Sequence, residues 1–184
     1  MSIFRGFIAI DIVSFPKLIQ FESEIKNTGA NIKLVEPENI HITLKFLGET
    51  KENHINQIEQ FLKESAQGLE PFEIQLKGSG VFPNPNYIKV IWIGIRNGDI
   101  IGKIANKIDE KISTLGFKKE NRNFSPHLTI ARVKSAANKD KLIRLIDKYK
   151  DIEFGSFTVE SIKLKSSELT PKGPIYTTLK KVKI

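Results

Sequence analysis

Two copies of one short motif constrain this chain more than any other feature. His41-Ile42-Thr43-Leu44 and His127-Leu128-Thr129-Ile130 lie 86 positions apart and share the pattern His-x-Thr-x. Each motif is preceded by a strand-like and a helix-like segment, and each is followed by a helix-like segment and an alternating, strand-like one. This repeated order predicts a duplicated α+β unit, folded into two lobes that are related by a pseudo-twofold axis.

The predicted elements indicate one bilobal domain over residues 1–184. Continuous or alternating apolar patterns predict strands over residues 4–12, 32–35, 40–47, 72–77, 88–95, 124–133, 157–164 and 175–182. Apolar residues at helical spacing predict helices around residues 18–25, 55–62, 100–115 and 142–149. Because several strands alternate, antiparallel or mixed sheets with outer helices and a central cleft are expected. The last strand has no counterpart in the repeat, and the Pro- and Gly-rich segment 78–87 is expected to be a loop at the lobe boundary.

The inventory of reactive residues is short. The 184-residue chain has no Cys, and this excludes thiolate nucleophiles, disulfides and Cys-ligated zinc. It has only three His, so any chemistry that needs an imidazole must come from these. Its formal net charge of +8 favours a polyanionic partner such as RNA, DNA, a nucleotide or acidic lipid, although charge alone is equally consistent with solubility. No run approaches the roughly 18 apolar residues of a membrane span, and no secretory signal is evident, so a cytoplasmic location is expected.

Strand geometry makes the repeated motif chemically useful. Residues i and i+2 of a strand point to the same face, so His41 lies beside Thr43, and His127 lies beside Thr129. One neutral and one protonated imidazole can take a proton from a nucleophile and give one to a leaving oxygen. The hydroxyls can hydrogen-bond phosphate oxygens as these gather charge. A single motif is more simply explained as polar strand residues facing solvent, but the symmetric pair favours catalysis. The third His, His54, has Asn56 at the matching position and is expected to be a solvated bystander.

A metal site is the less favoured alternative for these histidines. Two His are too few ligands, and a carboxylate would have to complete the set. Glu38 is three positions before His41, so a regular strand would turn it to the other face. Glu49 lies beyond Gly48, where strand parity no longer applies, and it stays open as a ligand. No metal or other cofactor is therefore expected.

The motif segments and several others together resemble the 2H phosphoesterase superfamily. Within it they are most similar to the RNA 2′,3′-cyclic phosphodiesterases, which are also called 2′-5′ RNA ligases. The resemblance extends over nearly the whole chain and is carried by residues 5–10, 36–49, 82–85, 90–94, 124–132 and 173–176. It implies a bilobal fold with a V-shaped cleft and metal-independent hydrolysis of RNA 2′,3′-cyclic phosphate ends to 2′-phosphomonoesters. The implied substrate is RNA with such ends, including tRNA fragments, and we expect a monomer that does not bind membranes.

The resemblance also assigns roles to residues. His41 would donate a proton to the leaving 3′ oxygen, His127 would activate water, and Thr43 and Thr129 would hold the phosphate. The pseudo-symmetry of the site leaves the opposite assignment of the two histidines open.

Arg132 would also bind phosphate, although it is five positions from His127 and a regular strand would turn it away unless a bulge re-aims it. Arg5 and Lys45 are expected to be solvated, and Phe46 is expected in the core. For Tyr176, stacking on a base and packing are equally consistent with the sequence.

Three other functions remain open on the sequence. The same site could join RNA ends by a 2′-5′ bond, or it could cleave 2′-5′ oligonucleotides or another cyclic phosphate. An RNA-binding module without turnover is the alternative from another class. Binding alone does not require two imidazoles beside two hydroxyls, so the paired motif favours an enzyme.

Overall fold

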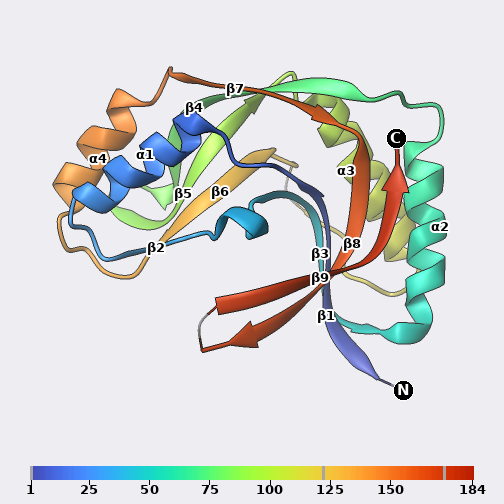
Figure 1. Cartoon of the computed structure of the whole chain (residues 1–184). Helices are drawn as coiled ribbons and strands as arrows, with labels where there is room; N and C mark the ends of the chain where they lie inside the picture. The colour runs from blue at the N-terminus through green and yellow to red at the C-terminus, as the bar shows by residue number, and fades with distance from the viewer. Residues whose placement is uncertain (1, 122, 172) are drawn as a thin grey trace.

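The computed structural model describes residues 2–121, 123–171 and 173–184 and has the expected α+β class. Strands and helices alternate along most of the chain, and three consecutive strands end it (Figure 1). The elements in chain order are β1 (Ile3–Asp11), α1 (Pro16–Asn27), β2 (Ile32–Leu34), η1 (Pro37–Asn39), β3 (His41–Lys51), η2 (Glu52–His54), α2 (Ile55–Ala66), β4 (Phe72–Asn84), β5 (Tyr87–Arg96), α3 (Asp99–Ser113), β6 (His127–Val133), α4 (Lys139–Lys148), β7 (Glu153–Val159), β8 (Ser161–Thr170) and β9 (Gly173–Lys183).

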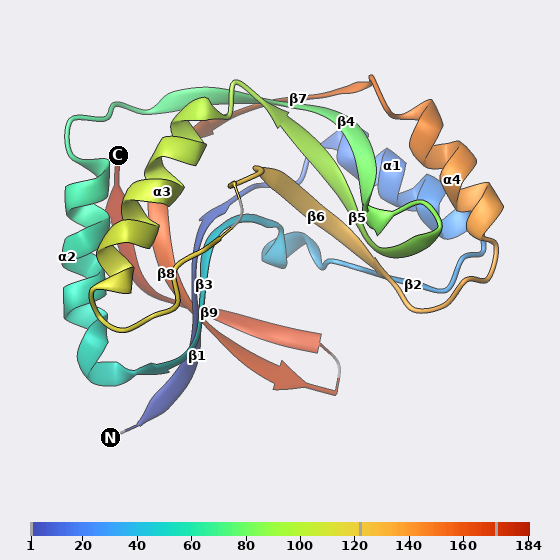
Figure 2. The same cartoon turned by 180° about the vertical axis from the view of Figure 1, so that it is seen from behind.

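The strands form two sheets, in which every pairing between described strands is antiparallel. A four-stranded sheet has the order β3-β1-β8-β9, and a five-stranded sheet has the order β2-β6-β5-β4-β7. Helices α2 and α3 pack on the four-stranded sheet, whereas α1 and α4 pack on the five-stranded sheet (Figures 1 and 2). The expectation of antiparallel or mixed sheets with outer helices is therefore confirmed in its antiparallel form.

The two sheets do not correspond to the two halves of the chain. The predicted order strand, helix, motif strand, helix, strand occurs as β1-α1-β3-α2-β4 and again as β5-α3-β6-α4-β7, with β2 as an extra strand in the first set. However, β4 pairs with β5 and β7 of the second set, and β8 and β9 complete the sheet of the first. The sheets match each other in the orders β3-β1-β8-β9 and β6-β5-β4-β7. Each motif strand therefore lies next to the first strand of its own set.

The predicted loop and lobe boundary at residues 78–87 is wrong. Strand β4 continues to Asn84 and forms a hairpin with β5 inside one sheet. Register shifts between Leu76 and Ser79 and between Phe82 and Pro83 absorb the irregular residues. Gly78 has φ +78° and donates its N–H to the carbonyl of Ile152 at 2.8 Å, so the backbone there stays paired although the ladder is interrupted. The predicted strand over residues 157–164 is likewise divided, since β7 ends at Val159 and β8 begins at Ser161.

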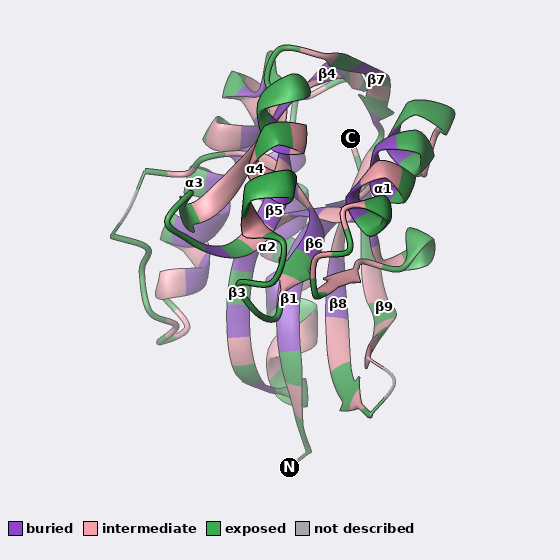
Figure 3. Ribbon diagram, turned by 90° about the vertical axis from the view of Figure 1, so that its left-hand side faces the viewer, coloured by how far each residue is buried: buried purple, intermediate pink, exposed green. Residues whose placement is uncertain are grey.

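The core lies between the sheets and the helices. Strand β1 is buried from Gly6 to Ile10, which agrees with its nearly continuous apolar run. The long apolar stripe predicted for α3 is also confirmed, because Ile101, Ile104, Ile108 and Ile112 are all buried. Figure 3 shows buried segments concentrated in β1, β3 and β8, with the exposed sides of α1 and α4 facing away from the sheets. In the described part of the chain, no helix is long and apolar enough to cross a membrane.

Glu22 on α1 makes stability depend on pH. Its side chain is buried, its Oε1 has no partner among the described residues, and burial raises its pKa to about 7. Because the folded pKa lies above the ordinary value of 4.5, the unfolded chain releases this proton first as pH rises, and stability falls between about pH 4.5 and 7. We expect Glu22→Gln to raise the free energy of unfolding by roughly 2 to 3 kcal/mol at pH 8 and by little at pH 4.

Urea unfolding at the two pH values measures this effect. The control is Glu24→Gln on the same helix, because hydrogen bonds from Lys148 and Tyr149 lower the pKa of Glu24. This control should bring no gain at pH 8. An equal gain for Glu22→Gln at both pH values would show that folding does not raise the pKa of Glu22.

Candidate active site

The chain brings the two motif strands together although they belong to different sheets. Strand β2 pairs with the far end of β6, and just after it the N–H of Val35 donates to the carbonyl of Ile130 at 2.9 Å. The short helix η1 then leads directly into β3, which contacts β6 (Figure 2). The strands that carry His41 and His127 therefore lie beside each other at the junction of the sheets.

Both motif histidines are held by the same backbone contact. Nδ1 of His41 lies 2.6 Å from the carbonyl oxygen of Asn39, and Nδ1 of His127 lies 2.8 Å from the carbonyl oxygen of Ser125. A carbonyl oxygen only accepts, so Nδ1 carries the proton and donates it in both residues. This contact orients each ring and leaves Nε2 as the nitrogen that can exchange a proton with a substrate.

Aromatic side chains pack against both imidazoles. The ring centroid of His41 lies 5.1 Å from that of Phe7 and 5.4 Å from that of Tyr176, which meets it edge-on. His127 lies 5.0 Å from Phe82, also edge-on. Tyr176 thus packs against Phe7 and His41, and its stacking on a base stays a prediction from the sequence. Sequence reasoning placed Phe7 in an apolar run and Phe82 in a loop, and only the pairing of neighbouring strands reveals that both support the histidines.

The environment of His41 favours its neutral form. Burial lowers the pKa of His41 below its ordinary value of 6.5, and the positive charges of Lys165 and Arg132 act in the same direction. The hydrogen bond to the Asn39 carbonyl and the charge of Asp11 oppose this lowering of the pKa. The neutral imidazole is thus favoured in the protein without substrate.

The two threonines share the faces of their histidines, as the strand alternation predicts. Thr43 and Thr129 are half-buried like His41 and His127, whereas the residues between them, Ile42 and Leu128, are fully buried. Thr43 lies opposite Ala9 on β1, and Thr129 lies opposite Trp92 on β5. Each motif strand therefore presents an imidazole and a hydroxyl on the side away from its core.

A bulge follows each threonine and reverses the strand parity. In β3 the register passes from Ala9–Thr43 to Ile8–Lys45 and skips Leu44. In β6 it passes from Trp92–Thr129 to Ile91–Ala131 and skips Ile130. Two consecutive residues are buried at each bulge, namely Leu44 with Lys45 and Ile130 with Ala131. The next residue in each strand, Phe46 or Arg132, consequently returns to the face of the histidine.

This shared bulge decides the positions of Arg132 and Phe46. Arg132 is exposed. Burial lowers the pKa of His41 on the other sheet, and the charge of Arg132 adds to this lowering. Burial raises the pKa of Tyr176, and the charge of Arg132 opposes this rise. The bulge that the sequence analysis required for a phosphate role is present. The core prediction for Phe46 is wrong, because this residue is 63% exposed. Its ring lies beside that of Phe7, at a centroid distance of 6.4 Å.

Three lysines form ion pairs that the sequence did not predict. Lys45 was expected to be solvated but is buried, and its Nζ pairs with Asp109 Oδ1 at 2.5 Å. Arg5 is exposed, as expected. Near His41, Asp11 accepts from Lys163 at 2.6 Å and from Lys165 at 2.7 Å. Sequence reasoning missed this last cluster, because nothing local distinguishes these lysines from the many others in the chain.

His54 lies outside the site. It ends η2, at the opposite end of β3 from His41, and its ring meets Phe117 edge-on at 5.7 Å. The expectation of a solvated ring is wrong, since its Nδ1 is buried and has no hydrogen-bond partner among the described residues. Its exclusion from the motif strands agrees with the bystander role.

Near His127 the surface is hollowed. A pocket of about 640 Å³ is bordered by Phe124 and Pro126, just before His127, and by the first turns of α3. Within the described ranges, no group of three or more His, Asp or Glu side chains is placed to hold a metal ion.

The arrangement defines a class of proteins with paired histidine motifs. In this class two His-x-Thr strands come from matching sheets, and backbone carbonyls orient both histidines. Comparisons with known proteins agree. The family model described as "AKAP7 2′5′ RNA ligase-like domain" matches residues 8–184. A protein of Methanocaldococcus jannaschii named RNA 2′,3′-cyclic phosphodiesterase is 50% identical over 96% of this chain and 98% of its own. A protein of the same name from Methanothermobacter thermautotrophicus is 42% identical over 94% of this chain and 95% of its own.

Solved structures show the same architecture. The crystal structure of TT0787 from Thermus thermophilus superimposes with a TM-score of 0.80 at 27% identity, covering 97% of each chain. Apo LigT of E. coli has a TM-score of 0.72 at 22% identity, covering all of this chain and 98% of its own, which demonstrates the shared fold. The chain therefore belongs to the 2′-5′ RNA ligase-like family of the 2H phosphoesterases.

Proposed function

We propose that this protein hydrolyses the 2′,3′-cyclic phosphate ends of RNA to 2′-phosphomonoesters by paired-histidine acid–base catalysis without a metal ion. The observation that supports this most is the matched pair of imidazoles, each with Nδ1 committed to a carbonyl and Nε2 available. The relatives in Methanocaldococcus and Methanothermobacter carry names for this reaction. RNA is thus the proposed substrate, and tRNA fragments with cyclic ends are suitable candidates.

The proposed reaction requires one proton to leave a water molecule and one to reach the leaving oxygen. His127 accepts the proton of water through Nε2 while the water oxygen bonds to phosphorus. His41 donates a proton through Nε2 to the 3′ oxygen as its bond to phosphorus breaks. The products are a 2′-phosphomonoester and a free 3′ hydroxyl, and the two histidines exchange protonation states. Thr43, Thr129 and Arg132 hold the non-bridging oxygens as charge gathers on them.

The lowered pKa of His41 bears on this assignment of roles. A neutral His41 in the free protein accepts a proton more readily than it donates one. A phosphate anion bound beside the ring favours the charged imidazole, and we propose that substrate binding thereby prepares His41 as the donor. The opposite assignment leaves the site unchanged but exchanges the protonation states. Analysis of the product as a 2′- or 3′-phosphate identifies the oxygen that leaves.

Two alternatives have a place beside this proposal. The same acid–base pair can catalyse formation of a 2′-5′ bond when the 5′ hydroxyl of a second RNA takes the place of water: His127 accepts the hydroxyl proton as its oxygen bonds to phosphorus, and His41 donates a proton to the leaving 3′ oxygen. A binding module without turnover would also use the cationic surface. A monomer in the cytoplasm remains a prediction from the sequence.

A turnover assay in EDTA tests the proposal. We expect hydrolysis of a 2′,3′-cyclic phosphate at the 3′ end of a short RNA, unchanged within about twofold by excess EDTA, with a bell-shaped pH profile of kcat/KM. The same preparation with added Zn²⁺ or Mn²⁺ serves as the control. Complete loss of turnover in EDTA would overturn the metal-free mechanism. An absence of turnover under every condition, with RNA binding retained, would favour the binding module.

A further inference from the structure

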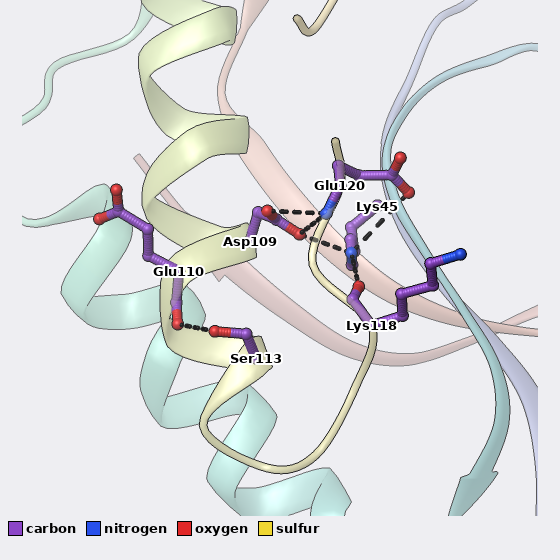
Figure 4. Close-up of polar contacts among 6 residues, drawn as sticks. All are labelled: Lys45, Asp109, Glu110, Ser113, Lys118 and Glu120. Atoms are coloured by element: carbon purple, nitrogen blue, oxygen red, sulfur yellow. Dashed lines mark hydrogen bonds and ion pairs between the residues drawn. The ribbon is translucent and has the colours of Figure 1, made fainter. Parts of the chain in front are cut away.

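Lys45 is buried two residues after Thr43, where the matching position of the other motif strand carries Ala131. Only 3% of Lys45 is exposed. Its Nζ donates to Asp109 Oδ1 at 2.5 Å and to the main-chain carbonyl of Lys118 at 2.6 Å (Figure 4). Lys45 belongs to β3 and Asp109 to α3, so this ion pair connects the strand of His41 to a helix of the other set.

Asp109 extends the connection to the segment that delivers His127. Its Oδ1 and Oδ2 accept the backbone N–H of Glu120 at 3.3 and 3.1 Å (Figure 4). Lys118 and Glu120 belong to the α3–β6 segment, which we define as the described residues 114–121 and 123–126. The last two residues of this segment are Ser125, whose carbonyl orients His127, and Pro126.

The other end of the α3–β6 segment is also fixed. Pro126 lies so close to Gly98 that a Cβ atom at Gly98 would come within 2.9 Å of the Pro126 Cγ. The segment is therefore held at Lys118 and Glu120 by the ion pair and at Pro126 by packing against the start of α3. Neither hold belongs to a sheet ladder. Leu115, Phe117 and Phe124 of the segment also pack against the core, so the polar contacts at Lys118 and Glu120 act together with apolar packing.

A contribution to stability explains this buried pair poorly. The cost of removing two charges from water offsets much of their attraction, and apolar replacement of both partners is often neutral or stabilising. A buried pair does impose one arrangement, because any other leaves a charge and several backbone groups unsatisfied. Strand β6 has the buried Ala131 at the position that matches Lys45, so this type of strand folds without a lysine at the bulge.

We propose that Lys45 and Asp109 are a positioning pair that places His127 relative to His41. Lys45 acts through the carbonyl of Lys118, and Asp109 acts through the N–H of Glu120, so that the α3–β6 segment follows one path between α3 and β6. The inference rests on the proposed acid–base function of the two histidines. A displacement of about 1 Å between two cooperating groups reduces turnover by as much as about 100-fold, which is the effect that this pair prevents.

The test is the double variant Lys45→Met with Asp109→Leu, which removes both charges and leaves neither unpaired. We expect a kcat reduced by about 10- to 100-fold, a KM within about twofold of the parent value, and faster hydrogen exchange of the Glu120 amide. Thermal unfolding sets a temperature at which every variant is fully folded, so that lost stability does not count as lost activity. Either single variant leaves a buried charge unpaired, which is why the double variant carries the test.

The matched control is Lys111→Met, which breaks the ion pair of Lys111 with Glu64 between α3 and α2. It keeps the Lys111 carbonyl, through which this residue accepts hydrogen bonds from Thr114 of the α3–β6 segment. A double variant with kcat within twofold of the parent would overturn the positioning role, as would an equal loss of kcat in the control. If the parent protein itself does not turn over the cyclic phosphate, the proposed function fails instead. Parental turnover with an unaffected double variant refutes the positioning pair alone.

Discussion

Replacement of His41 or of His127 by alanine is expected to lower kcat for cyclic phosphate hydrolysis by about 10²- to 10⁴-fold each. Each imidazole presents Nε2 because a backbone carbonyl accepts a hydrogen bond from its Nδ1–H. Alanine removes the imidazole and with it the proposed proton donor or acceptor. The double variant should be only slightly less active than the less active single variant, because the acid and the base act in the same step and that step is already impaired when one of them is missing. Steady-state kinetics on a 2′,3′-cyclic phosphate substrate measures all three proteins.

His54→Ala is the internal control for these variants. It removes the third imidazole of the chain, which lies at the opposite end of β3 and contacts Phe117. We expect its kcat to stay within about twofold of the parent value at a temperature where it is folded. A loss of activity as large as that of His41→Ala would show that the pair in the motif strands is not the catalytic pair.

Replacement of Thr43 and Thr129 by valine should produce the second largest effect. Valine keeps the β-branched shape that suits a strand but lacks the hydroxyl that is proposed to donate to phosphate. Loss of one such donor costs roughly 10²-fold in kcat, and loss of both should cost more than either alone. Serine at either position keeps the donor and should retain most of the activity.

Thr158→Val provides the control for the threonine variants, since Thr158 is an exposed strand residue on β7, in the same sheet as β6 but away from both motif strands. Its kinetics should match those of the parent. If Thr43→Val and Thr129→Val also stay within about threefold of the parent in kcat and KM, the hydroxyls do not hold the phosphate. Binding of inorganic phosphate to the same variants, measured by calorimetry, separates ground-state binding from an effect confined to the transition state.

The elements and the motif were predictable because their signals are local. Apolar periodicity identifies β1 and α3 whatever their partners are, and the burial of both agrees with it. Alternation along a strand places His41 beside Thr43 and His127 beside Thr129 without knowledge of the sheet. The scarcity of histidine then left a single pair with matching surroundings, and that pair lies on two strands in contact.

The wrong faces predicted for Phe46 and Arg132 share a physical cause, which is that a bulge depends on the neighbouring strand. Leu44 and Ile130 are skipped in the ladders with β1 and β5, and no residue in the motif itself marks the skip. Parity counted along the sequence therefore placed Phe46 in the core and left Arg132 facing away from the histidine. With the bulge, both residues return to the site face.

The repeated His-x-Thr motif and the two sets of elements were thus determined by the sequence alone, through short-range periodicity, whereas the choice between antiparallel and mixed sheets was left to the structure. Only the tertiary structure decided that β4 and β8 exchange sheets, that the charge of Arg132 acts on His41, and that Lys45 is buried against Asp109. Each of these depends on a partner remote in the chain, 64 positions away for Lys45 and Asp109. A buried charge in particular is stable only where folding supplies its counter-charge and hydrogen bonds, and no local pattern records that supply.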